Sequence, residues 1–529
     1  MHKLRKHLKK HFNWGIVFIL LVASFFRFYN LNKWLVWGMD QEYEAYIVKN
    51  IVSLRHFPLI GVNVSDTGVY LGPFFIYFAT LPFLIFQGNP VGWAITASLV
   101  GVVVCLLIYK IGKAMFSETA GYFGAFLYAV SFLATFYDRQ FWNSSLVPFF
   151  SLLIGYLLYT ILQGQTHKLL ILSLAFGLAI QTHLSILVFL PLIIYVLWLK
   201  RHEFSKRVII FSIIIFILLQ SPLILFELRH GFLNSKATIN LINRFNISQL
   251  SSSYTERIGL FVSTLGRFGW LPAAPDLFLE TGKCLDYYPF RKGAYIESIL
   301  IVLGGLVFFI WYHFRYLLFS SKYKKHAECL NQHNSAIVVI GLVLITFFVI
   351  LVYSSRLYEH YFLYFLPWLA ILLGWVVSHF WKSKFGRIIL SIILLLFISS
   401  NLLTVFTANM SYSYFDKLNI VEFVKKNLGD KSYSLEALGE CPRFGGYRYL
   451  FSLYDLPPQR SYMDSYFYWL YPDDISEQKP GKIVLLSLID YRDSPDKIAR
   501  WQERKLQFIT QLEVFAEKRS GNIQAYILE

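Results

Sequence analysis

The sequence predicts an α-helical polytopic membrane protein that carries a small α/β domain at its C-terminal end. Hydrophobic residues make up 56% of the 529-residue chain and aromatic residues 19%, a composition that is typical of membrane proteins. Apolar runs long enough to cross a bilayer recur along the first four hundred residues. From about residue 411 the pattern changes to mixed charge, Pro and Gly with short apolar runs. The run 482–486 and a helical pattern near 494–516 predict a folded domain outside the membrane.

The basic residues set the predicted topology. The formal net charge is +17, but Lys and Arg gather in short clusters between apolar runs, which indicates cytoplasmic loops rather than a nucleic-acid surface. Twelve crossings would put the clusters 200–207 and 322–325 outside. Reading 70–87, which Gly and Pro interrupt, as a helix on the outer face leaves eleven spans and returns every short basic loop to the cytoplasm. The predicted spans are 14–31, 92–110, 120–137, 145–162, 168–182, 184–199, 208–227, 294–314, 335–353, 359–379 and 386–406.

This topology gives two predicted domains. Residues 1–410 form the transmembrane domain, with 31–91 as an external loop, and 411–529 form the extracytoplasmic domain. The N-terminus is then cytoplasmic and the chain a multi-pass protein of the plasma membrane. The four cysteines show no metal or redox spacing, and only Cys284 and Cys441 are expected outside, where they could pair.

An acidic cluster follows the first span. Residues 37–44 read Trp-Gly-Met-Asp-Gln-Glu-Tyr-Glu, and three carboxylates beside a membrane surface are costly unless they are used. If a helix begins near Asp40, then Asp40 and Glu44 share one face and Glu42 is turned away. The ordinary alternative is a helix N-cap with an acidic first turn, which Asp40 alone would satisfy.

Other polar residues converge on the same outer face. Each has an ordinary explanation: an interfacial ion pair, a helix-end histidine, or an aromatic belt. Together they supply a carboxylate for general-base catalysis, cations for a phosphate and aromatic rings for a sugar. The residues are Asp138, Arg139, His183, Arg356, His360 and Tyr361.

Missing motifs narrow the function further. The chain has no Gly-x-x-x-x-Gly-Lys phosphate loop, no Gly-x-Gly-x-x-Gly and no His-Glu-x-x-His, which argues against a nucleotide-powered pump and a zinc protease. An outward-facing transferase without a cytoplasmic nucleotide-binding domain must take its activated group from the membrane.

These features resemble a known family. The Asp-x-Glu cluster after the first span, the Gly-Pro segment 72–77, the segment 136–148 and the late segment 356–374 are similar to the polyprenyl-phosphate-sugar-dependent glycosyltransferases of the GT-C fold. The likeness is nearest to glycosyltransferase family 39, with its protein O-mannosyltransferases and aminoarabinose transferases, and it covers roughly residues 10–400. The chain departs from the family pattern at Gln41, which separates the two acids.

The resemblance implies inverting transfer of a sugar from a polyprenyl-phosphate donor to a lipid, glycan or protein acceptor. It implies that Asp40 is the general base and that Glu42 orients the acceptor or helps to hold a divalent cation such as Mg or Mn. Arg356, His360 and Arg139 would bind the donor phosphate. Two rivals remain: a transporter or flippase of lipid-linked glycans, and a catalytically inactive membrane scaffold. Acceptor, sugar or metal contacts would come from Glu44, Asp138, His183 and Tyr361.

Overall fold

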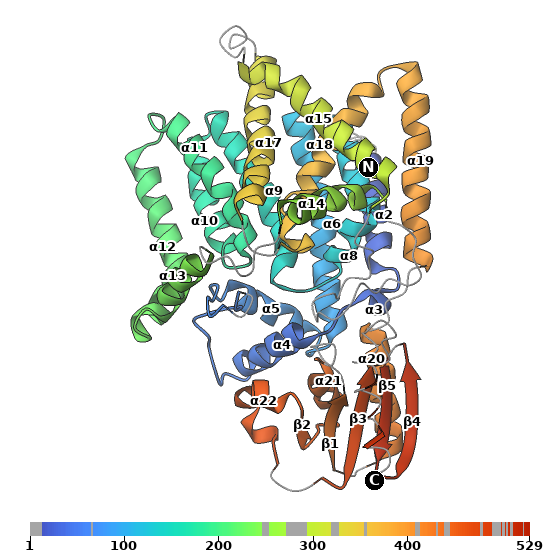
Figure 1. Ribbon diagram of the computed structural model, residues 1–529. Coiled ribbons are helices and arrows are strands. Elements are labelled where there is room, and N and C mark those ends of the chain that lie inside the picture. Colours follow the sequence, from blue (N-terminus) through green and yellow to red (C-terminus); the bar gives the residue numbers. More distant parts are fainter. Residues whose placement is uncertain are drawn as a thin grey trace, which may run out of the picture.

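The protein folds as a helical bundle with a sheet-containing domain at one end (Figure 1). This computed structural model describes residues 13–64, 67–245, 253–270, 294–318, 327–353, 357–407, 413–429, 432–438, 445–476, 480–488, 512–521 and 523–529, with single residues between 499 and 507.

Each of the eleven predicted spans coincides with helix in the bundle. Within the described residues, six helices are long and apolar enough to cross a membrane, and a pair bent by 69° would make a seventh. Shorter apolar helices account for the remaining predicted spans, so the number eleven stays a prediction. The bundle helices are α2 (Trp14–Phe28), α6 (Pro90–Met115), the bent pair α7 (Glu118–Val130) and α8 (Phe132–Asp138), α9 (Val147–Leu162), α10 (Leu169–Ala179), α11 (Leu190–Lys200), α12 (Lys206–Arg229), α15 (Ile296–Leu318), α17 (Ala327–Val352), α18 (Leu366–Phe380) and α19 (Lys384–Thr407).

The centre of the bundle is close-packed and its periphery is apolar and exposed. A Cβ atom on Gly374 of α18 would lie 2.3 Å from the main-chain nitrogen of Gly124 in α7. Only glycine therefore lets these two backbones touch, as small residues do between membrane helices. Helix α12, in contrast, exposes Ile210, Phe211 and Leu218 on its outer side, as expected of a surface that faces lipid.

The first loop lies across one end of the bundle. It contains α3 (Leu31–Trp34), α4 (Met39–Val52) and α5 (Phe74–Ile85). Helix α5 has 12 residues and is therefore about 18 Å long. The chain contacts the C-terminal domain both before α5, where Arg55 pairs with Asp473, and after it, where the Tyr449 hydroxyl donates to the Gly88 carbonyl. The chain thus enters and leaves α5 at the same end of the molecule.

The long loop after α12 contains two helices that the sequence analysis did not predict, α13 (Leu233–Phe245) and α14 (Tyr254–Gly269). Helix α14 packs against α15, α17 and α8. The turn between α11 and α12, bounded by Lys200 and Lys206, lies at the opposite end of the bundle from the sheet (Figure 1). The basic turn and the first loop are therefore at opposite ends.

The C-terminal domain is a five-stranded mixed sheet with helices packed on it. The strand order is β2-β1-β3-β5-β4; β1 is parallel to β2 and β3, and β5 is antiparallel to β3 and β4. The predicted apolar run 482–486 is strand β3. The helix expected near 494–516 falls mostly outside the described residues. Its predicted end was wrong, because the residues from Val514 onward form strand β4. The elements are α20 (Tyr414–Leu428), β1 (Tyr433–Leu438), α21 (Tyr447–Leu453), β2 (Arg460–Ser461), α22 (Asp464–Phe467), η6 (Tyr468–Leu470), η7 (Pro472–Asp474), β3 (Lys482–Leu488), β4 (Val514–Ser520) and β5 (Ile523–Leu528).

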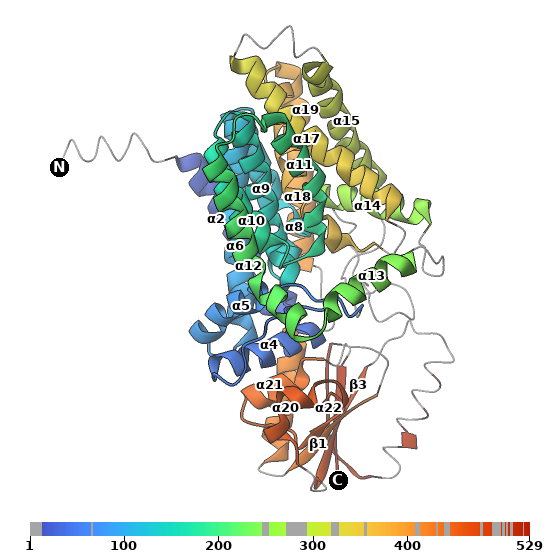
Figure 2. The same cartoon turned by 90° about the vertical axis from the view of Figure 1, so that its left-hand side faces the viewer.

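Helix α4 lies between the bundle and the sheet domain, a position that Figure 2 shows from the side. Side chains on one side of α4 therefore face the bundle, and those on the other side face the sheet domain. This position determines what each acid of the cluster can do.

Candidate active site

Helix α4 begins where the sequence analysis predicted, at Met39, one residue before Asp40. The side chain of Gln41 reaches back and its Oε1 accepts a hydrogen bond of 3.0 Å from the Gly38 N–H. This contact closes the first turn. Asp40 is exposed in that turn, where the positive end of the helix dipole favours a carboxylate.

Glu44 lies one turn after Asp40 and is almost completely buried, with 2% of its surface exposed. Its Oε2 has no hydrogen-bond partner among the described residues. Burial, and then the negative charge of Asp40, raise the pKa of Glu44 well above its ordinary value. A neutral Glu44 would spare the site a buried negative charge beside the carboxylate of Asp40.

Glu42 points away from this pair, as the helical spacing predicted, and into the C-terminal domain. Its Oε2 accepts from the Gly446 N–H and its Oε1 from the Tyr449 N–H, both at 2.8 Å. These N–H groups belong to the start of α21, so Glu42 caps that helix. Burial raises the pKa of Glu42, while the two main-chain donors oppose the rise. Because Glu42 is fully buried, the arrangement does not support its predicted place at the reacting atoms.

A lysine completes this interface. Lys417 Nζ donates to the Trp37 carbonyl at 2.6 Å and to the Gly445 carbonyl at 2.5 Å. Burial lowers the pKa of Lys417 to about 7. Gly446 has φ +93°, and a Cβ atom there would lie 2.4 Å from the Trp37 ring. The segment just before Asp40 is therefore held tightly by the C-terminal domain.

The residues do not supply an evident metal site. Among the described residues, no three or more His, Cys, Asp or Glu side chains converge as metal ligands would. Asp40 and Glu44 are two carboxylates, and a divalent cation of the Mg class usually needs further oxygen ligands. The expected Mg or Mn therefore stays a prediction, and no step below depends on it.

The structure brings His183, His360 and Tyr361 together. The His360 ring centroid lies 5.7 Å from that of His183 and 4.7 Å from that of Tyr361, with the Trp142 ring at 5.0 Å. His183 Nδ1 accepts a hydrogen bond of 3.1 Å from the Ser185 N–H, which leaves Nε2 as the protonated nitrogen of a neutral ring. The cluster thus offers the Nε2–H group of His183 as a donor among aromatic rings. Arg356 lies outside the described residues.

A buried ion pair supports the turn that carries His360. Arg267 of α14 approaches the Glu359 carboxylate at 2.5 Å, and the Tyr137 hydroxyl donates to its other oxygen at 3.1 Å. The sequence analysis missed Arg267 because the stretch between the predicted spans 208–227 and 294–314 was taken as a loop. The Ser253-x-x-Glu256 capping box at the start of α14 is a signal that could have located this helix.

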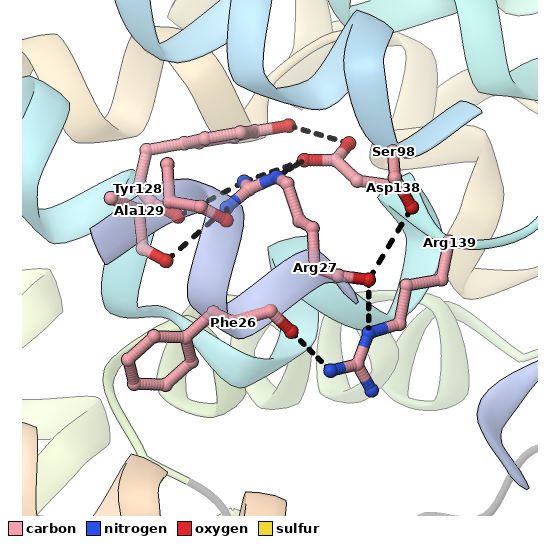
Figure 3. Close-up of polar contacts among 8 residues, drawn as sticks. Phe26, Arg27, Ser98, Tyr128, Ala129, Asp138 and Arg139 are labelled. Atoms are coloured by element: carbon pink, nitrogen blue, oxygen red, sulfur yellow. Dashed lines mark hydrogen bonds and ion pairs between the residues drawn. The ribbon is translucent and has the colours of Figure 1, made fainter. Parts of the chain in front are cut away.

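Asp138 and Arg139 belong to a separate buried network (Figure 3). Asp138 pairs with Arg27 at 2.6 Å and accepts from the Tyr128 hydroxyl at 3.2 Å. Arg139 donates to the carbonyls of Phe26, Arg27 and Tyr29, the unpaired carbonyls that end helix α2. These contacts engage Nε and Nη2 of Arg139, whereas its Nη1 has no hydrogen-bond partner among the described residues. The phosphate contact expected of Arg139 and the acceptor or metal contact expected of Asp138 therefore stay predictions. Arg27, the lone charge of the first span, was the signal for this network.

Aromatic packing joins the two ends of the candidate site. The Trp37 ring lies 5.8 Å from that of Trp93, which lies 4.9 Å from that of Phe141. Phe141 precedes Trp142 of the histidine cluster. The Asp40 helix and the histidine cluster are thus parts of one packed region at the same end of the bundle.

Comparisons with known proteins agree with this architecture. Residues 71–226 match the family described as dolichyl-phosphate-mannose-protein mannosyltransferase. The fold is similar to that of ArnT from Cupriavidus metallidurans bound to undecaprenyl phosphate, with a TM-score of 0.60 and 11% identity over 97% of each chain. The apo form of the same protein matches with a TM-score of 0.58 and 12% identity, again over 97% of each chain. An oligosaccharyltransferase from Archaeoglobus fulgidus matches with a TM-score of 0.49 and 13% identity, over 90% of this chain and 68% of that one. No curated protein sequence matches. The family match over residues 71–226 and the fold shared with ArnT agree with the resemblance that the sequence predicted.

Proposed function

Because the chain has the GT-C fold, we propose that it is a membrane glycosyltransferase that uses a polyprenyl-phosphate sugar as donor. The observation that carries this proposal is the setting of Asp40. It is an exposed carboxylate on a helix whose other acids are buried, at the bundle end where the first loop gathers. The similar fold of ArnT, which was solved bound to undecaprenyl phosphate, supports a lipid phosphate as the leaving group.

In the proposed reaction, an acceptor hydroxyl attacks the anomeric carbon of the donor sugar. Asp40 takes the hydroxyl proton as the new C–O bond forms. The bond between the anomeric carbon and the phosphate oxygen breaks on the opposite face, so the configuration inverts and polyprenyl phosphate leaves. Hydrogen-bond donors stabilise the charge that develops on this phosphate. His183, His360 and Arg356 are the proposed donors, and Tyr361 lines their cluster.

The proposal includes a side of the membrane. The positive-inside rule puts the turn between α11 and α12, with Lys200 and Arg201, in the cytoplasm. The first loop and the sheet domain lie at the other end and would then be extracytoplasmic. Single cysteines at Asn32 and Gln165, both exposed, test this with an impermeant thiol reagent. Only the cysteine at Asn32 should react in intact cells, and the reverse result would invert the topology.

Asp40→Asn tests the chemistry. The change keeps the shape of the side chain and removes the proton acceptor. Release of polyprenyl phosphate from a polyprenyl-phosphate sugar should fall by a factor of about a hundred to ten thousand, as for loss of a general base. A matched control is Glu422→Gln, at an exposed position on α20.

Two outcomes would contradict the proposal. Turnover of Asp40→Asn within about threefold of the wild type would place the base elsewhere, since a lost base costs far more. A wild-type protein that moves lipid-linked glycans across vesicles without releasing polyprenyl phosphate would be a transporter.

A further inference from the structure

Exposed aromatic side chains gather on one segment of the C-terminal domain. Tyr466, Tyr468 and Trp469, in α22 and η6, are exposed over 62%, 59% and 50% of their surfaces. Phe467, between them in the chain, is buried and anchors the segment. Neighbouring exposed aromatic residues outside the membrane-spanning helices are a candidate binding surface.

This segment lies against the helix that carries Asp40. The Tyr43 ring is 5.5 Å from the Phe467 ring and 6.1 Å from the Trp469 ring. Asn50 Nδ2 also donates to the Leu470 carbonyl at 3.1 Å. The exposed aromatics are therefore fixed relative to α4 and do not hang on a separate domain.

Helical geometry places Asp40 close to Tyr43, the residue of α4 that meets the aromatic segment. At about 100° per residue, Asp40 lies about 60° around α4 from Tyr43 and about 40° from Glu44 on its other side. Asp40 thus stands on the flank of the helix, between the side that meets the C-terminal domain and the side that carries buried Glu44. A molecule on Tyr43 and Trp469 would approach Asp40 from the domain side.

The position of the surface argues against membrane lipid as its occupant. Both views place α22 on the far side of α4 from the bundle (Figures 1 and 2). Aromatic belts lie at the ends of membrane spans, whereas here a whole helix stands between the aromatics and the spans. The occupant must come from the aqueous side.

The chemistry of the surface favours a carbohydrate. Tyrosine and tryptophan combine an apolar ring face with an O–H or N–H edge, which matches a sugar ring with its C–H faces and hydroxyl groups. Shortly after α4 and η6 in the chain come Arg55 and Asp473, whose exposed side chains form an ion pair of 3.1 Å and can bond to hydroxyls. A saccharide would also bring the hydroxyl that the reaction requires.

We infer that Tyr466, Tyr468 and Trp469 form, with Tyr43, an acceptor subsite that binds a saccharide and leads one of its hydroxyl groups to Asp40. As an acceptor site, the subsite rests on the proposed function. The donor then reaches Asp40 from the bundle side and the acceptor from the domain side, so the two substrates do not compete for one path.

Glycan retention tests the subsite without depending on catalysis. The full-length protein in lipid nanodiscs is immobilised, and the probe is the total glycan released from the envelope of the source cells and labelled with a fluorophore. Wild type and Asp40→Asn should retain labelled glycan. Trp469→Ala should lose about tenfold or more of the affinity, as expected for a central aromatic contact, and Tyr468→Ala should weaken binding less.

Phe515→Ala is the matched control, because Phe515 is exposed over 53% of its surface but lies in the edge strand β4, at the other end of the sheet. It should retain glycan as the wild type does. Thermal unfolding checks that all variants fold.

Absence of retention by the wild type, or equal retention by Trp469→Ala and Phe515→Ala, would overturn the inference. So would retention only of glycan-free envelope peptides, which would make the surface a protein-binding one. Retention by a protein that shows no transfer would uphold the subsite while refuting the proposed function.

Discussion

Glu42 accepts a 2.8 Å hydrogen bond from the main-chain N–H of Tyr449, a residue 407 positions later in the chain. A second bond comes from Gly446. The second acid of the Asp-x-Glu cluster therefore binds the C-terminal domain, and the first remains exposed. Glu42 thus anchors helix α4 to the C-terminal domain, whereas Asp40, the proposed base, is exposed. The C-terminal domain is part of the scaffold that holds Asp40.

We predict that Glu42→Gln loosens this scaffold. The amide keeps one acceptor oxygen but turns an NH₂ group toward a main-chain donor in a buried site. Leaving a buried donor unsatisfied costs about 1–3 kcal/mol. Hydrogen exchange of α4 and α21 should therefore accelerate, and turnover should fall together with this protection.

The control for this prediction is Glu422→Gln on α20, where the carboxylate is exposed and exchange should not change. If Glu42→Gln abolishes turnover while α4 stays fully protected, Glu42 takes part in the chemistry.

Glu44 predicts a dependence of stability on pH. Its pKa in the folded protein is raised well above 4.5 by burial and by Asp40, so the folded state holds a proton that the unfolded state loses. The stability that Glu44 contributes is fully present below about pH 4.5 and is lost as the pH rises through the raised pKa. Glu44→Gln mimics the neutral acid and removes this loss.

The melting temperature measured from pH 4 to pH 8 tests this sign. The Glu44→Gln variant should melt close to the wild type at the acid end and above it at the alkaline end. Turnover should stay within about threefold, since a neutral side chain remains beside the base. A melting difference that is constant across the range would mean that Glu44 does not titrate there.

The proposed donor site predicts a kinetic signature. His360→Asn should raise the KM for the polyprenyl-phosphate sugar by about tenfold or more, because a charge-assisted hydrogen bond to phosphate is lost. Arg356→Lys should do the same, since a lysine cannot make a two-point contact with phosphate. His167→Asn, at an exposed position, is the control. Unchanged donor KM in both variants would remove this cluster from the donor site.

The sequence could predict what depends on local spacing. The start of α4, the shared side of Asp40 and Glu44, and the opposite direction of Glu42 all follow from 3.6 residues per turn. The partner of Glu42 could not be predicted, because it is brought close only by the folding of a domain four hundred residues away. Arg139 shows a similar limit: an arginine at a span end looks the same in sequence whether it meets a phosphate or the carbonyls that end helix α2.

The last prediction concerns Asp138 and distinguishes a structural role of this residue from a catalytic one. Asp138→Asn leaves Arg27 buried without a countercharge, and breaking a buried pair from one side costs about 3–5 kcal/mol. The amount of folded protein and its melting temperature should therefore fall. Asp138 contacts Arg27 and Tyr128 inside the bundle, so the molecules that do fold should keep their KM for donor. Glu118→Gln, which removes an exposed partner of Lys113, should change neither quantity, because exposed pairs contribute little. A variant of Asp138 with normal stability and a large loss of turnover would return this residue to the reaction.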